Sequence, residues 1–182
     1  MKPIFTIHAG EYLVASGLEK KFKDLNIWLP SKDTGIDLLL TDKTNKKTAS
    51  IQVKFSKDFN TTHVKENLRP NIKGTGWWTL NREKIESSKA DFWVFVIYSF
   101  EKRSNDFVVI KPRELLKIYE NLDRVGSIIH SYITVTTKKT AFETRGLSKS
   151  EVQAIGDNKF DNKQRALTQF LNNWTLVINE LK

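Results

Sequence analysis

The chain of 182 residues contains no cysteine, one methionine and only three histidines. Without cysteine, disulfides and cysteine-ligated zinc sites are excluded. His8, His63 and His130 are scattered, with no second ligand at helical spacing, which argues against a histidine metal site. The most apolar run, residues 92–100, is too short to cross a bilayer as a helix. The N-terminal residues also lack the apolar core of a signal peptide, so we expect a cytoplasmic protein without a membrane partner.

Acidic residues are also scarce relative to basic ones. Thirty Lys and Arg residues stand against 21 Asp and Glu, which gives a formal net charge of +9. This excess favours polyanionic partners, nucleic acid before an anionic membrane surface, although solubility alone also explains a basic surface. The hydrophobic content of 39% is typical of a globular protein, and the length fits one domain with a real core, residues 1–182.

Residues 35–55 predict two strands joined by a polar turn. If the turn centres near Asn45, Asp37 on the first strand lies opposite Gln52 or Lys54 on the second. Because side chains alternate along a strand, Gln52 and Lys54 share one face. A carboxylate, an amide oxygen and an ammonium group are therefore expected to converge on one face of an otherwise apolar hairpin.

A helix is predicted over residues 8–25, and Glu11 lies on its apolar stripe. The stripe consists of residues at helical spacing, namely Val14, Ala15, Leu18 and Phe22. A carboxylate on the face that packs against a sheet needs a partner. One interpretation is that Glu11 only complements the helix dipole in the first turn. With the polar hairpin nearby, we favour a functional role in which Glu11 packs above Asp37, Gln52 and Lys54.

The rest of the chain predicts alternating strands and helices. We expect a strand at 26–30, little regular structure from 56 to about 80 apart from a weak helix at 61–68, a helix at 81–87, a buried central strand at 90–100, a hairpin partner at 107–110, a helix from Pro112 and a strand at 132–137. Capping boxes at Ser148 and Asp161 predict two more helices, and the second of these is amphipathic through residues 167–181. This order predicts a mixed α/β domain with a β-sheet core flanked by helices.

Two further groups of residues are candidates for contact with a nucleic acid. Trp77 and Trp78 follow a basic, glycine-broken segment, where an aromatic ring can stack on an unpaired base. Tryptophan more often closes a core under a loop, and we expect this of at least one of the pair. The candidates for phosphate contact are basic residues, each of which could equally belong to a solvated face: Lys57, Arg69, Lys73, Arg82 and Lys84. Asp33 is an alternative to Asp37 as the functional carboxylate. It lies in a predicted turn, however, where aspartate usually caps the local backbone.

Glu11 on the first helix, Asp37 on a strand and the tripeptide Gln52-Val53-Lys54 on the next strand resemble the motif of the PD-(D/E)XK nuclease superfamily. The superfamily includes restriction endonucleases and Holliday junction resolvases. The helix, the hairpin and the apolar strand at 90–100 follow its common core in order. The resemblance covers residues 6–110 and leaves 111–182 as an elaboration. Ile36 stands where the family commonly has proline, and Gln52 replaces the second acidic residue.

The resemblance implies a restriction endonuclease-like fold and a Mg²⁺-dependent DNA endonuclease, with Mn²⁺ as a substitute. Hydrolysis of a phosphodiester requires charge neutralisation, water activation and stabilisation of the leaving oxygen. Asp37, Gln52, the Val53 carbonyl and Glu11 would supply the oxygen ligands that Mg²⁺ prefers. Lys54 would act through positioning and electrostatics rather than as a general base, since nearby carboxylates oppose the loss of its proton. Cleavage of duplex DNA would call for two active sites and hence a homodimer.

Three alternatives to a restriction-type enzyme remain open at this point. The first is a structure-specific nuclease that cuts junctions, similar to the Holliday junction resolvases. The second is a non-catalytic DNA-binding module on the same scaffold, and the third is an interaction protein whose basic surface serves an acidic partner.

Overall fold

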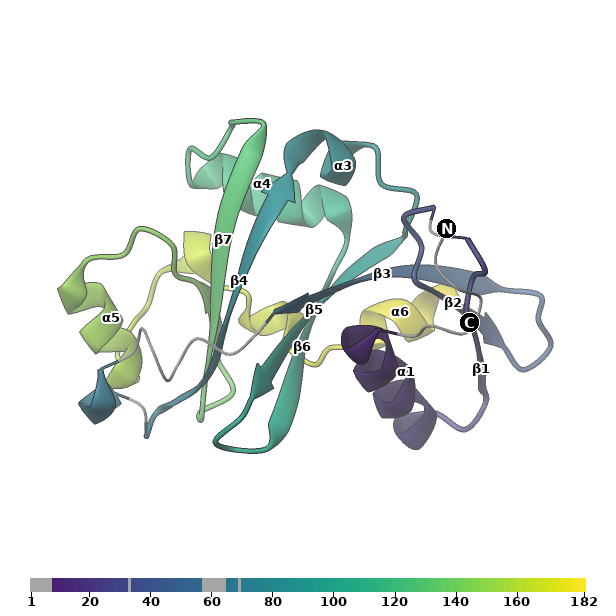
Figure 1. Ribbon diagram of the computed structural model, residues 1–182, viewed down its shortest axis with the longest axis horizontal. Coiled ribbons are helices and arrows are strands. Elements are labelled where there is room, and N and C mark those ends of the chain that lie inside the picture. The colour runs from purple at the N-terminus through teal and green to yellow at the C-terminus, as the bar shows by residue number, and fades with distance from the viewer. Residues whose placement is uncertain (1–7, 33, 57–64, 69) are drawn as a thin grey trace.

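The computed structural model describes residues 8–32, 34–56, 65–68 and 70–182, and it has a mixed α/β fold (Figure 1). The helices are α1 (Ala9–Lys21), α3 (Arg82–Glu86), α4 (Pro112–Asn121), α5 (Lys149–Gly156) and α6 (Thr175–Glu180), with 3₁₀ turns η1 (Glu66–Leu68), η2 (Lys163–Arg165) and η3 (Thr168–Phe170). The strands are β1 (Leu25–Trp28), β2 (Leu38–Asp42), β3 (Thr48–Ser56), β4 (Ile72–Asn81), β5 (Phe92–Ser99), β6 (Ser104–Ile110), β7 (Ile128–Thr136) and β8 (Ala141–Glu143).

The strands form two sheets. The large sheet has five strands in the order β1-β2-β3-β5-β6, and the small sheet has three in the order β4-β7-β8. In the large sheet only β3 and β5 run parallel, and every other pair in either sheet is antiparallel. The prediction of a mixed sheet flanked by helices is thus confirmed.

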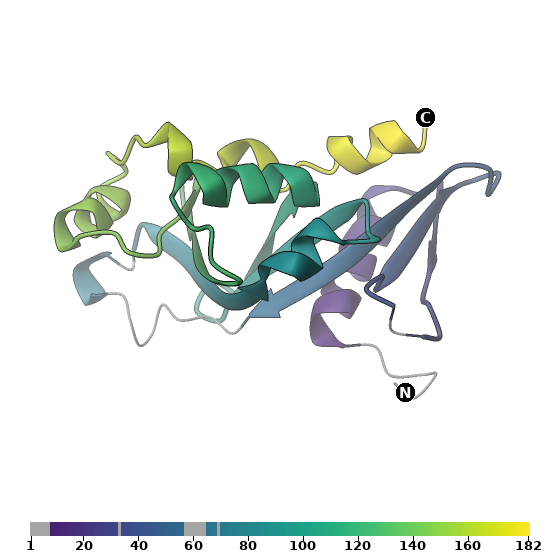
Figure 2. The same ribbon diagram turned by 90° about the horizontal axis from the view of Figure 1, so that it is seen from above.

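Strand β5 lies between the two larger of the three hydrophobic cores that the described residues form. Its even-numbered side chains pack with α1 and α6, and its odd-numbered side chains pack with the small sheet, α3 and α4. Figures 1 and 2 show α1 and α6 beside β1, β2 and β3, and show α4 with β4 and β7 in the other half. Because both faces of β5 are covered, the continuous apolar sequence from Phe92 is explained, as predicted.

The hairpin of β2 and β3 has the predicted register. Leu38 pairs with Ile51, so the residue before β2, Asp37, comes opposite Gln52. The turn centres on Asn45, whose φ of 58° is in the left-handed region that asparagine tolerates. Local turn chemistry therefore fixes the alignment of the polar residues.

The strand β4 was not predicted, because its glycines resemble loop residues in the sequence. Its exposed and buried positions alternate from Gly76 to Leu80, as in any strand with one covered face. A Cβ on Gly76 would lie 2.2 Å from the Trp78 ring, and one on Gly74 would lie 2.9 Å from Ile97. The glycines therefore make room for side chains of the core rather than end the strand. Most of the expected helix at 61–68 lies outside the described residues, and its end forms η1.

The long helix expected over residues 167–181 is wrong, since the segment is divided into η3 and α6. At the break, Asn172 has a φ of 53°. Its side chain accepts a hydrogen bond from Phe107 N at 2.9 Å and donates one to Asp106 Oδ1 at 2.8 Å. Leu171 also forms an isolated antiparallel bridge with Val108. The chain thus leaves the helical path to cover the outer edge of β6.

Other predicted elements are present with shifted ends. Pro112 begins α4, Asn81 caps α3 and Ser148 with Glu151 forms the capping box of α5. The box expected at Asp161 gives only η2, which Asn162 caps.

The small sheet joins residues 6–110 to residues 111–182, because β4 lies before residue 110 and pairs along its length with β7.

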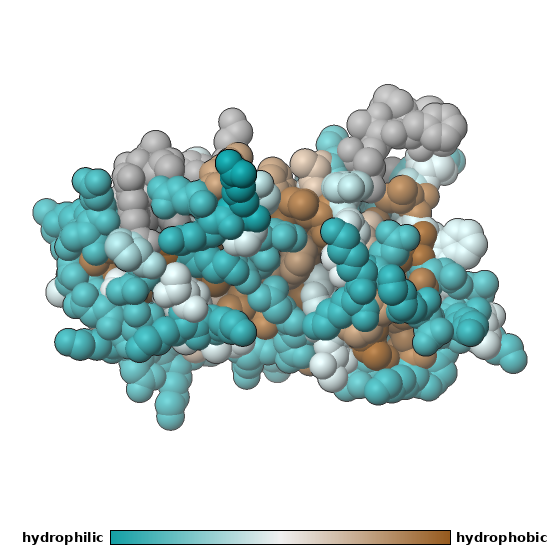
Figure 3. Space-filling model, turned by 90° about the horizontal axis from the view of Figure 1, so that it is seen from below, coloured by the Kyte–Doolittle hydropathy of each residue, from teal (hydrophilic) through white to brown (hydrophobic). Residues whose placement is uncertain are grey.

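Among the described residues, no helix has both the length and the apolar character needed to cross a membrane. Seen from below, hydrophobic side chains gather in a strip between two hydrophilic ends (Figure 3).

Substitution of Asn172 by glycine tests the link between the C-terminal segment and β6. Glycine accepts the positive φ, so the change removes only the side-chain hydrogen bonds, and we expect the free energy of unfolding to fall by about 1–3 kcal/mol. Urea unfolding measures the loss. Lys139→Gly is the matched control, because Lys139 also has a positive φ of 61° but an exposed side chain. Equal stability of the two variants would contradict the assignment.

Asp42 at the hairpin turn gives a prediction for acid stability. Hydrogen bonds from Thr44 and from the backbone N–H groups of Lys47 and Lys46 hold the pKa of Asp42 at about 2, below the usual 3.8. Because the folded pKa is depressed, this stabilisation is complete above about pH 4 and is lost as the pH falls toward 2. We expect urea unfolding of Asp42→Asn to show a smaller loss of stability over this interval than the wild type. Asp24→Asn, at an exposed site in the neighbouring loop, should behave like the wild type.

Candidate active site

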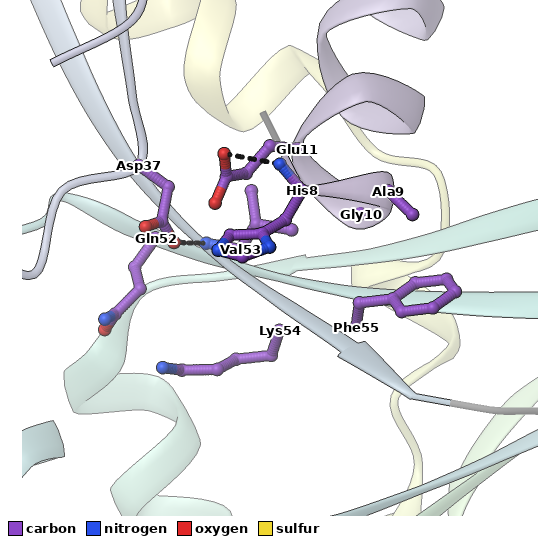
Figure 4. A pocket seen from close by; sticks show the side chains of 9 residues that line it. All are labelled: His8, Ala9, Gly10, Glu11, Asp37, Gln52, Val53, Lys54 and Phe55. Carbon is purple, nitrogen blue, oxygen red and sulfur yellow. Dashed lines mark hydrogen bonds between the residues drawn. The ribbon is translucent and has the colours of Figure 1, made fainter. Parts of the chain in front are cut away.

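A pocket of about 550 Å³ opens at the edge of β3, next to Asp37, the residue that precedes β2. It is lined by the start of α1, the residue before β2 and the second half of β3: His8, Ala9, Gly10, Glu11, Asp37, Gln52, Val53, Lys54 and Phe55 (Figure 4). All four residues proposed as catalytic from the sequence therefore line one pocket. The pairing of β2 with β3 does not extend past Leu38 and Ile51. The edge of β3 after Ile51 is therefore open to side chains.

Asp37 is held at this open edge by the backbone of β3. Its Oδ2 accepts a hydrogen bond from Val53 N at 2.7 Å, and its own N–H donates to Ile51 O at 2.8 Å. The carboxylate thus continues the ladder in place of a backbone carbonyl. A carboxylate has about four acceptor positions, so this hydrogen bond leaves capacity for a ligand.

The carbonyl of Val53 points toward the same edge. In a strand, the N–H and C=O groups of one residue point to the same neighbouring strand. Since Val53 N donates to Asp37, the Val53 oxygen is also directed to the side at which Asp37 lies. The middle residue of the Gln52-Val53-Lys54 tripeptide therefore offers a backbone oxygen next to a carboxylate.

Glu11 lies on the buried face of α1, as predicted, and is 7% exposed. Its Oε2 accepts a hydrogen bond from His8 N at 3.2 Å, which caps the first turn of the helix. The carboxylate also lines the pocket and points from α1 toward Asp37 (Figure 4). Glu11 therefore both caps the helix and lines the pocket, and its functional role stays a prediction.

The expectation that Glu11 packs directly above Gln52 and Lys54 is wrong in one respect. Helix α1 packs on the opposite face of β3, where a Cβ on Gly10 would lie 2.6 Å from Phe55 Cβ and 3.2 Å from Val53. Phe55 and Val53 alternate with Lys54 along the strand, so Lys54 points away from α1. The groups still meet in one pocket, because it wraps around the open edge of the strand rather than over one face.

Lys54 is positioned by an aromatic ring of the central strand. Its Nζ lies 4.7 Å from the centroid of Trp93, which is 2% exposed. The indole Nε1 in turn donates to Ser88 Oγ at 2.9 Å. A cation above the face of an indole is attracted to it, which suits an electrostatic role. In Figure 4 the ends of Lys54 and Gln52 point to the same side of the pocket.

The proposed phosphate contacts have different environments. Lys57 and Arg69, like Asp33 and His63, lie outside the described residues. Lys73 Nζ forms an ion pair with Asp106 Oδ2 at 2.7 Å.

Arg82 is engaged in salt bridges with Glu86 at 2.7 Å and Glu120 at 2.5 Å, and the hydrogen bond to Glu120 raises the pKa of the guanidinium. Arg82 therefore joins α3 to α4 and is poorly placed for phosphate contact. Lys84 is exposed.

The donor set fits a hard divalent cation. Two carboxylates, one amide and one backbone carbonyl are oxygen ligands, which Mg²⁺ prefers while it retains several water molecules. In the part of the chain that the structure describes, no group of three or more His, Cys, Asp or Glu side chains could hold a metal. A metal at this pocket would thus depend on the neutral oxygens of Gln52 and Val53 in addition to Asp37 and Glu11.

Two contributors to the site were missed from the sequence. The sequence pattern shows Trp93 only as one residue of the apolar strand, whereas its place directly opposite Gln52 in the parallel pair brings it under Lys54. Ser56, two residues beyond Lys54, accepts a hydrogen bond from Trp77 N at 2.8 Å and so connects β3 to the small sheet. Neither role has a local signal, because each depends on a pairing between distant segments.

Comparison of the chain with protein-family models, with curated proteins and with solved structures finds no match.

Proposed function

We propose that the protein is a Mg²⁺-dependent DNA endonuclease of the restriction endonuclease-like type. The observation that carries the proposal is the placement of Asp37 against the backbone of β3, which gathers two carboxylates, a backbone carbonyl, an amide and an ammonium group in one pocket. The sequence resemblance supports it, since α1, the β2–β3 hairpin and the buried strand β5 follow the implied order. The charge of +9 fits a polyanionic substrate.

Each residue of the pocket has a distinct part in the proposed reaction. Asp37, Glu11, Gln52 and the Val53 carbonyl would hold the cation, which when bound supplies Lewis acidity toward the phosphate and the attacking water. Lys54, fixed over Trp93, would orient that water and offset the negative charge that accumulates on the phosphorus oxygens. Glu11 would restore the charge that Gln52 lacks relative to a second acidic residue.

Cleavage of both strands of a duplex needs two such pockets, which a homodimer with twofold symmetry would provide. The proposal therefore includes self-association, with one pocket acting on each strand. Sedimentation with and without a DNA duplex measures this directly.

The catalytic proposal is tested with supercoiled plasmid in the presence of Mg²⁺, Mn²⁺ or EDTA. We expect nicking or linearisation with either metal and none with EDTA. Asp37→Asn keeps an oxygen that can accept the hydrogen bond from Val53 N but removes the charge, and we expect it to lower the cleavage rate at least about 100-fold. Lys54→Met keeps the stem over Trp93 without the ammonium group and should lower the rate similarly.

Lys117→Ala on α4 is the matched control for loss of a lysine, and it should cleave like the wild type. Glu11→Gln can still cap α1, so a lower rate with unchanged thermal stability would assign Glu11 to the pocket rather than to the helix. The proposal fails if the wild type leaves plasmid, linear duplex and single strands intact with both metals, and if Asp37→Asn does not alter Mn²⁺ binding.

The same experiment separates the alternative functions. Cleavage of four-way junctions without cleavage of linear duplex would identify a structure-specific nuclease. Salt-sensitive DNA binding that survives Asp37→Asn and Lys54→Met, with no cleavage by the wild type, would identify a non-catalytic DNA-binding module.

A further inference from the structure

We propose that the outer face of the small sheet binds an unpaired base of a single-stranded nucleic acid on Trp77, next to the pocket. Trp78 packs inward against Phe95 with ring centroids 5.0 Å apart and is 7% exposed, whereas Trp77 points outward and is 43% exposed. The core therefore uses only one of the two tryptophans. The inference rests on the proposed function and adds to it a contact for an unpaired base beside the strand that is cleaved.

The Trp77 ring belongs to an ordered aromatic group. Its centroid lies 6.1 Å from that of Tyr132 on β7, with an interplanar angle of 87°. Arg145 lies over the Tyr132 ring at 5.1 Å from the centroid, and its Nη1 donates to the Tyr132 hydroxyl at 3.0 Å. Tyr132 thus supports both side chains and limits their rotation, which reduces the entropy that they lose on binding a ligand.

The charge of this face suits a nucleic acid rather than an apolar partner. Arg145 is exposed, and within the described residues its guanidinium forms no salt bridge with a carboxylate. Its neighbour Arg124, by contrast, is paired with the buried Glu143 at 2.6 Å. An aromatic ring beside a cation is the combination that binds single strands, since the ring stacks on a base and the cation attracts the phosphate.

The backbone of Trp77 contacts β3 two residues beyond the pocket residue Lys54. Trp77 N donates to Ser56 Oγ at 2.8 Å, and Ser56 lies on the same face of β3 as Lys54, two residues further on. Two residues of a strand span about 6.6 Å. Adjacent nucleotides of one DNA strand are about 3.4 Å apart along a duplex and further apart when the strand is extended. A strand whose phosphate lies at Lys54 could therefore place a base at Trp77 within a few nucleotides.

Binding of a dye-labelled oligothymidine of about 12 nucleotides tests the inference, with fluorescence anisotropy as the readout and EDTA present so that no cleavage occurs. We expect Trp77→Ala to weaken binding about 5- to 150-fold, the effect of losing one stacked base. Trp77→Phe keeps a flat ring and should restore most of the affinity. Trp28→Ala is the matched control, because Trp28 is 51% exposed but lies on the edge strand β1 of the other sheet.

The inference is overturned if Trp77→Ala binds the oligonucleotide like Trp28→Ala, if Trp77→Phe binds as weakly as Trp77→Ala while its melting curve matches the wild type, or if a blunt duplex depends equally on Trp77. Oligouridine in parallel distinguishes RNA from DNA as the source of the unpaired base. Strand binding that depends on Trp77 would support this inference and refute the proposed function if plasmid, linear duplex and single strands all stay intact and Asp37→Asn does not alter Mn²⁺ binding. Cleavage that depends on Asp37 without any role of Trp77 in strand binding would do the reverse.

Discussion

The hydrogen bond from Val53 N to the carboxylate of Asp37 is the interaction on which the candidate site depends. It forms because β2 starts at Leu38, two residues after the position that would pair with Val53, so a side chain takes the position of a strand carbonyl. An exposed edge of a strand must satisfy its N–H groups, and a carboxylate does so with a charge-assisted hydrogen bond. The same contact that completes the ladder thus fixes a negative charge beside the Val53 carbonyl.

The surroundings of this contact come from different layers of the fold. Helix α1 brings Glu11 from one face of β3, while Gln52 and Lys54 project from the other face toward Trp93 of the neighbouring strand. The close approach of α1 depends on Gly10, where any side chain would collide with Phe55. The open edge is the place at which groups from both faces can reach a common ligand, and this explains why a site forms there rather than over the centre of the sheet.

Much of the hairpin and its polar face could be predicted from the sequence, because turn chemistry and alternation act over a few residues. The strand β4 could not, since its partner β7 lies about fifty residues further along and its glycines are required by Trp78 and Ile97. The division of the last predicted helix has a similar cause, because the hydrogen bonds of Asn172 to β6 outweigh the local helical pattern. The face on which α1 packs was also hidden, since helical periodicity identifies the buried side of a helix but not the face of the sheet that it covers.

The shared position of β5 between the two cores has a consequence for how the protein unfolds. Neither core can lose its packing without exposing one row of β5 side chains to solvent. The two cores should therefore unfold together rather than as independent units. A fragment that ends at residue 110 would keep the pocket residues but would leave Trp78 and the inner face of β4 without β7. The C-terminal third is in this sense part of the scaffold of the site, although it contributes no residue to it.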